Sequence, residues 1–136
     1  MRRNHGTLAY TGNTATYTRG FTLAAGGGEV DVTIAGQTLT VATGAITSAS
    51  NGSLTLGGGG STTITSALSL GTGGVTKTGS GTLNLDNATQ SYNILTASAG
   101  TTNVNGTLGT LPGLAVVTVS PNAKLKFGTV SQTSPR

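Results

Sequence analysis

The chain of 136 residues contains no cysteine and no tryptophan, one histidine, three prolines and only 7% charged residues. Without cysteine, a disulfide framework, a zinc knuckle and a thiol nucleophile are excluded. The scarcity of charge and proline also argues against intrinsic disorder, which is usually rich in both. No apolar run approaches the roughly 18 residues that a membrane-spanning helix needs. We therefore expect a folded chain with no membrane span.

Acidic side chains are limited to Glu29, Asp31 and Asp86. Glu29 and Asp31 would share one strand face with Cα atoms roughly 6.5 Å apart, which is within range for paired glycosidase carboxylates. Because no aromatic side chain is evidently placed to hold a sugar, a solvated acidic face is the preferred interpretation. His5 is the only histidine and stands without a nearby acid or thiol, so it completes neither a metal site nor a catalytic triad. We expect no catalytic, cofactor-binding or metal-binding residues, and a protein that is not an enzyme.

Glycine, with 23 residues, is abundant but carries no ligand-binding motif. The four glycines at 57–60 are not followed by Lys-Ser or Lys-Thr, so they form no phosphate-binding loop. GGGEVDV at 26–32 is similar to a calcium-binding nonapeptide, but its spacing is wrong and it occurs once, so no calcium is expected. Asn51, Asn87 and Asn105 begin N-x-S/T sequons, which matter only in a glycosylating host.

Basic residues give a net charge of +4, and most of them lie near the two ends of the chain. They are Arg2 and Arg3 at one end and Lys124, Lys126 and Arg136 at the other. A nucleic-acid binder would show a basic stripe with stacking aromatics, so nucleic acid is not an expected partner. The two early arginines resemble the start of a signal peptide, but no apolar segment follows them. If the protein is exported, we expect its signal to lie outside this chain.

The clearest structural pattern lies in residues 74–108, where Leu83 and Leu85 alternate with polar residues. Such alternation predicts a strand with one buried face. The same pattern predicts that Val30, Val32 and Ile34 point inward while Glu29, Asp31 and Thr33 point outward. It also places Leu125 and Phe127 inward, with Lys124 and Lys126 outward. Tyr92 falls in a polar linker between two such segments.

Turn signals separate these short strands. Glycines at 26–28 and 57–60 and the pairs Asn51-Gly52 and Pro112-Gly113 are typical of corners. Even spacing and recurring motifs favour an all-β, right-handed parallel β-helix (a solenoid) of roughly five to six coils. An antiparallel β-sandwich is the alternative. We expect one domain at 6–130, with flexible tails at 1–5 and 131–136.

Three segments in order, GVTKTGSGTLNL (74–85), ASAGTTNVNGTLGT (97–110) and AVVTVSPNAKL (115–125), resemble the autotransporter-associated β-strand repeat, also called the passenger-associated transport repeat. GTLAYTG (6–12) and RGFTLAAGGGEVDV (19–32) resemble the coil that often precedes it. The chain departs from the pattern at 92–95, where a glycine-containing turn is expected. The resemblance implies a right-handed parallel β-helix in a secreted passenger region, used as a stalk for export and display.

These observations predict a structural module of a bacterial surface or secreted protein, either a passenger stalk or a self-stacking fibre subunit. The expected location is extracellular or at the cell surface, associated with the outer membrane. Self-association through the coil ends, or contact with other coils of a longer chain, is the expected interaction. In such a stack Lys124 and Lys126 would meet Glu29 and Asp31 of the next copy. The alternative is an adhesin-like module that binds glycans or host matrix, and a polysaccharide-active enzyme is disfavoured by the few carboxylates.

Overall fold

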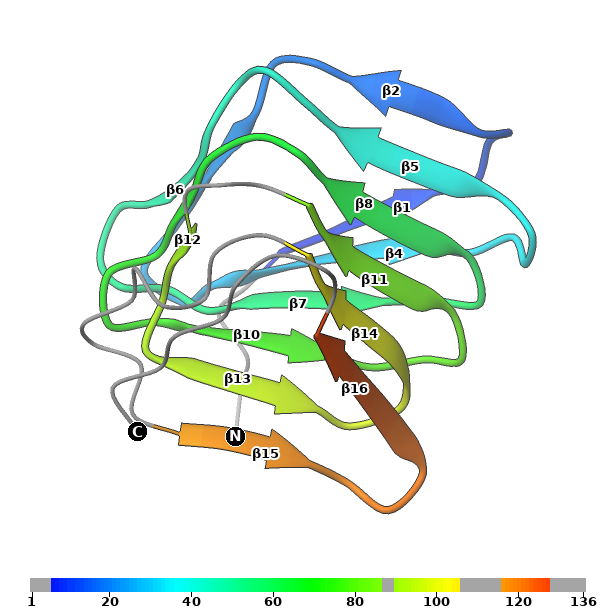
Figure 1. Ribbon diagram of the computed structural model, residues 1–136. Coiled ribbons are helices and arrows are strands. Elements are labelled where there is room, and N and C mark those ends of the chain that lie inside the picture. The colour runs from blue at the N-terminus through cyan, green and yellow to red at the C-terminus, as the bar shows by residue number, and fades with distance from the viewer. Residues whose placement is uncertain (1–5, 87–89, 106–115, 128–136) are drawn as a thin grey trace.

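The computed structural model of the protein describes residues 6–86, 90–105 and 116–127, which form three parallel β-sheets (Figure 1). Sheet A contains, in spatial order, β1 (Gly6–Tyr10), β4 (Gly28–Val32), β7 (Leu54–Gly57), β10 (Gly74–Lys77), β13 (Ile94–Ala97) and β15 (Val116–Val119). Sheet B contains β2 (Ala15–Tyr17), β5 (Thr38–Val41), β8 (Ser61–Ile64), β11 (Thr82–Leu85), β14 (Gly100–Val104) and β16 (Ala123–Phe127). Sheet C contains β3 (Phe21–Leu23), β6 (Ile46–Ser48), β9 (Leu68–Ser69) and β12 (Gln90–Ser91).

The order of strands within each sheet defines a β-solenoid. Through the first four coils each strand pairs with the strand three positions later, because every coil adds one strand to each sheet. All of the pairings between described strands are parallel. Parallel pairing confirms the solenoid and excludes the antiparallel sandwich. Among the described strands and turns, no helix is long and apolar enough to cross a membrane.

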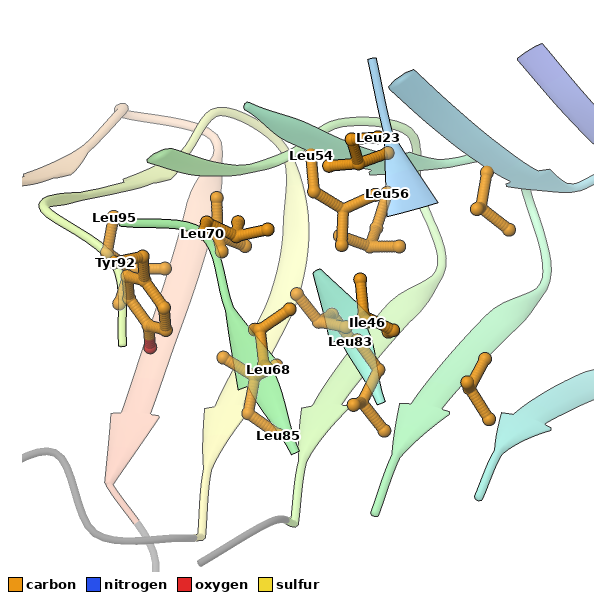
Figure 2. Packing of buried hydrophobic residues seen from close by; sticks show 14 of the residues in the cluster. Leu23, Ile46, Leu54, Leu56, Leu68, Leu70, Leu83, Leu85, Tyr92 and Leu95 are labelled. Atoms are coloured by element: carbon orange, nitrogen blue, oxygen red, sulfur yellow. The ribbon is translucent and has the colours of Figure 1, made fainter. Parts of the chain in front are cut away.

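The core is a set of columns in which inward residues of successive coils lie in register. One column in sheet B runs through Val41, Ile64, Leu85 and Val104, and all four side chains are buried. Figure 2 shows apolar side chains of the core, Leu85 among them, filling the space between the sheets, with Tyr92 and Leu95 at one end of the row. Full burial stabilises each leucine by about 1.5–3 kcal/mol relative to exposure. Stacking thus provides the burial that no single coil could achieve.

The glycine run at 57–60 forms a corner between sheets A and B, as predicted. Strand β7 ends at Gly57 and β8 begins at Ser61, with Gly58 at a φ of +94°. Gly81 of the next coil lies against this corner, where an added Cβ would be 1.7 Å from the carbonyl oxygen of Gly60. Only glycine fits a backbone approach of this kind. The glycine runs therefore set how closely successive coils stack at this edge.

One sequence-based placement is wrong. Ile34 is 42% exposed rather than inward, because β4 ends at Val32 and the chain turns through Gly36. Tyr92 lies between β12 and β13, within the segment expected to be a polar linker, and its side chain is buried with only 1% of its surface exposed. The inward positions of Val30, Val32 and Leu125 are confirmed, although Leu125 is only partly buried. The expected tails at 1–5 and 131–136, the Pro112-Gly113 turn and the side chain of Phe127 lie outside the described residues.

Candidate functional surfaces

The acidic pair lies on the outward face of sheet A, as the alternation in β4 predicts. Glu29 is in register with Thr55 and Asp31 with Gly57 of the next coil. A Cβ added at Gly57 would lie 2.6 Å from both Asp31 Oδ1 and Thr78 Oγ1. The Asp31 carboxylate therefore occupies space that the glycine leaves free, next to a hydroxyl. In the described part of the chain, no three His, Asp or Glu side chains are placed together to hold a metal ion.

The third carboxylate, Asp86, lies apart from this pair, directly after β11 of sheet B. It is exposed, and its Oδ1 accepts a hydrogen bond of 2.6 Å from the Asn105 side-chain amide of the next coil. The structure therefore does not bring the three carboxylates together. Of the other candidate residues, His5 and Asn87 lie outside the described residues, and Asn51 occupies a turn at a φ of +59°. Asn51 Oδ1 accepts a hydrogen bond from Thr72 N at 3.0 Å, so this sequon residue helps to join two coils.

Polar side chains form continuous outward columns on both long sheets. On sheet B the column contains Thr40, Thr63, Asn84, Asn103 and Lys126. Asn103 donates to Asn84 Oδ1 at 2.7 Å, and Asn84 donates to Thr63 Oγ1 at 3.2 Å. On sheet A the corresponding column contains Thr55, Thr76, Thr96 and Thr118. These hydroxyl and amide groups give the solenoid two ordered polar faces that can form hydrogen bonds.

A buried lysine lies in the wall of the core, and sequence reasoning did not identify it. Lys77 takes the inward place between Leu56 and Ala97 in its column and is only 2% exposed. Its ammonium donates to the carbonyl oxygens of Thr78 and Gly79, the latter at 3.1 Å, at the corner after β10. Burial lowers the pKa of Lys77 below its usual value. The signal was its position two residues after Val75, which put it on the inward face.

Burial of Tyr92 raises the pKa of its phenol well above the ordinary 10.0. The folded state therefore holds this proton more tightly than the unfolded state does. The resulting stabilisation is fully present below pH 10.0 and is lost as pH rises above that value. We expect the free energy of unfolding to fall with pH in this alkaline range, and Tyr92→Phe to reduce the slope. Denaturant titrations on both sides of pH 10.0 would measure it.

Tyr17→Phe is the matched control for this prediction, because the Tyr17 ring is 36% exposed and lies in the first coil. The control should retain the slope of the wild-type protein. If Tyr92→Phe and Tyr17→Phe give the same slope as the wild type, the buried phenol is not the source of the alkaline loss.

The two ends of the solenoid differ from its middle. A cavity of about 360 Å³ opens at the first coil and is lined by side chains that include Leu8, Phe21, Leu23 and Val30. At the other end, Lys124 and Lys126 are exposed on the outward face of β16, as predicted. They lie on sheet B, whereas Glu29 and Asp31 lie on sheet A. The lysines and the acids therefore occupy different sheets of the solenoid.

Comparison with known proteins relates part of this chain to an autotransporter. No protein-family model matches the chain, and no solved structure matches it. An alignment 58 residues long covers 39% of the chain and is 50% identical to the protein named adhesin BmaC autotransporter of Brucella suis biovar 1 (strain 1330). The match spans 2% of the length of that protein. The chain is thus a β-solenoid with a region similar to a bacterial autotransporter adhesin.

Proposed function

We propose that this chain is a structural β-solenoid module of a bacterial surface or secreted protein, acting as a passenger stalk or a self-stacking fibre subunit. The observation that carries the proposal is the unbroken stacking of parallel strands in two six-stranded sheets. In such a stack each coil contacts only its neighbours, so length grows coil by coil while the cross-section stays constant. The similarity to an autotransporter adhesin supports a location outside the cell, at the outer-membrane surface.

The chemistry of the described surfaces supports a non-enzymatic role. Glu29 and Asp31 lie beside threonine and glycine on a face of sheet A. Asp86 lies next to sheet B and accepts a hydrogen bond from the Asn105 side chain. The inward columns are mostly apolar, with Thr62, Lys77 and Thr102 as buried polar exceptions. On sheet B, outward asparagine and threonine side chains form hydrogen bonds from coil to coil. These contacts stabilise a rigid scaffold. It requires no cofactor, metal or nucleic acid.

Removal of one whole coil tests the proposal. Leu54 and Val75 occupy the same place in successive coils, so deletion of residues 54–74 joins two coils in register. We expect the shortened chain to keep its β-sheet circular dichroism and to unfold cooperatively, with a lower free energy of unfolding because one coil interface is lost. When the chain is fused between a surface anchor and a reporter domain, the reporter should still be displayed.

Deletion of residues 54–63 is the matched control, since it removes half a coil and places the following strands against the wrong sheets. This variant should lose both the β-sheet spectrum and display of the reporter. Equal behaviour of the two deletions would contradict a function that depends on stacked coils.

An adhesin-like module that binds glycans or host matrix is the second candidate. The observation that favours it is the pair of ordered Thr and Asn columns, together with the similarity to a protein named as an adhesin. Glycan-array binding by the folded chain, abolished by Thr63→Ala combined with Asn84→Ala, would favour this role. An empty array from a folded sample would favour the structural role alone.

A further inference from the structure

The first coil leaves the apolar interior of the solenoid open to solvent. Leu8 of sheet A occupies a column that faces the interior of the solenoid, but it is 51% exposed. Val30, its partner in the same column in the next coil, is only 3% exposed. Side chains from all three sheets, including Leu8, Tyr17 and Phe21, line the cavity of about 360 Å³ at this end. A Cβ added at Gly6 would meet no atom within 4 Å. The space next to Gly6 is therefore empty.

The last coil presents the opposite surface. Val117 and Val119 take the inward places of β15, in register with Leu95 and Ala97. The two valines are 43% and 47% exposed, although Leu95 and Ala97 are buried at 0% and 1%. Both ends thus expose side chains that every internal coil buries against its neighbour. Among the described strands, β1 and β15 each pair on one side only. A strand edge of this kind is a template for pairing with another chain.

We propose that the last coil of one copy of this chain docks in register onto the first coil of a second copy. This inference rests on the proposed structural function and names the partner for the open end. The columns predict the fit: Val119 continues the column of Leu8, and Val117 continues the column of Gly6. Val117 of one copy therefore lies over Gly6 of the other, where the first coil has space for a side chain.

The pairing that results is the same as the pairing inside the molecule. Strand β15 of one copy adds to the free edge of β1, and β16 adds to the free edge of β2. In sheet B, Leu125 lies over Ala15 and Lys126 over Thr16, because these residues share columns through the intervening coils. Each end is thus complementary to the other and not to itself. The contact is head-to-tail and can be repeated along a fibre.

In this register the electrostatic contact expected from the sequence does not form. Lys124 and Lys126 lie on sheet B, so an aligned copy places them against β2, while Glu29 and Asp31 lie one coil further along on sheet A. The contact is then formed by apolar side chains and backbone hydrogen bonds and contains no lysine–carboxylate pair. Because each copy carries a net charge of +4, salt should screen the repulsion between copies and favour docking.

Disulfide trapping tests the register directly, because introduced cysteines would be the only thiols in the protein. Thr7 and Thr118 are both exposed and share one outward column of sheet A. Docked in register, their Cα atoms would be about 4.8 Å apart, within the range for a disulfide. We expect a mixture of the Thr7→Cys and Thr118→Cys proteins to form a covalent heterodimer under mild oxidation.

A mixture of Thr7→Cys with Lys126→Cys is the matched control, since Lys126 is equally exposed but lies on the other sheet. This mixture should give at least tenfold less heterodimer on a non-reducing gel. Equal cross-linking in both mixtures would overturn the proposed register. Homodimers of either single variant, formed as fast as the heterodimer, would indicate a head-to-head or tail-to-tail contact and would also overturn it.

Sedimentation of the chain without cysteines provides the second measurement. We expect the average mass to rise with protein concentration, and Val119→Lys to abolish this rise by placing a charge in the contact. Thr118→Lys adds the same charge to the outward face of the same strand and should preserve association. A chain that stays monomeric at all concentrations and keeps its β-sheet spectrum would overturn the proposal. A monomer that binds an apolar dye in the cavity of the first coil would also overturn it, because the cavity would then be open to solvent and not covered by a second copy. Neither result would affect the coil-deletion test, which depends only on stacking within one chain.

Discussion

Replacement of Gly81 by alanine is expected to lower the free energy of unfolding by about 3 kcal/mol or more. The added Cβ would lie 1.7 Å from the carbonyl oxygen of Gly60 and 2.6 Å from its carbonyl carbon. Both are backbone atoms of the adjacent coil, so relief of the clash requires two corners to move apart. The midpoint of urea unfolding, measured with an unchanged m-value, would report the loss.

Gly59→Ala is the control for this prediction because it lies in the same corner. The nearest atom to a Cβ at Gly59 is the carbonyl oxygen of Thr33 at 3.7 Å, which is ordinary van der Waals contact. We therefore expect this substitution to change stability by less than about 1 kcal/mol. Similar losses at both positions would show that the corner relaxes and that the close approach of Gly81 to Gly60 is not a constraint.

Lys77→Ala should be the second severe substitution, with an expected loss of about 2–4 kcal/mol. Alanine removes a buried hydrocarbon stem from the core and leaves the carbonyls of Thr78 and Gly79 without their donor. Lys77→Met keeps most of the stem. It also removes the cost of burying an ammonium, which offsets the lost hydrogen bonds, so we expect a change of about 1 kcal/mol or less. Thermal and urea unfolding of both variants would separate the contributions of stem and charge.

The ammonium of Lys77 also makes stability depend on pH. Because its pKa is lowered in the folded state, the unfolded chain binds the proton more tightly between that lowered value and 10.5. This part of the stability therefore rises with pH across the window, in the opposite direction to the loss caused by Tyr92 at higher pH. Lys77→Met should remove the rise. If the slope in this window is unchanged in Lys77→Met, the ammonium is not desolvated in solution.

The repetitive parts of the fold could be predicted from local sequence. Alternation in β4 and β11 identified inward Val30 and Leu83, because a strand with one buried face has a period of two. Gly57 and its three successors identified a corner, since strands resume directly after them. The failures concern the length of a strand rather than its period. Ile34 continues the alternation, but the strand ends before it, so its side chain does not reach the core.

The candidate surfaces were less predictable because they depend on stacking between coils. Lys77 has a charged side chain, yet it faces inward because it is in register with Leu56 and Ala97. Its ammonium donates hydrogen bonds to carbonyl oxygens at the corner. Lys126 and Glu29 were expected to meet between copies, and only the strand order reveals that they lie on different sheets. The local pattern of Leu8 is that of a core residue. Its exposure follows from its place in the first coil.

The burial of Tyr92 allows its absorption and emission to report on unfolding of one part of the solenoid. The chain has no tryptophan and three tyrosines, so tyrosine dominates its near-ultraviolet absorption and emission. Of the three rings, Tyr92 is buried, Tyr10 is half-buried and Tyr17 is exposed. Tyr10 and Tyr17 lie in the first coil, and Tyr92 lies between β12 and β13, near the opposite end. A Tyr10→Phe, Tyr17→Phe double variant would therefore carry one native chromophore that reports when the far coils unfold.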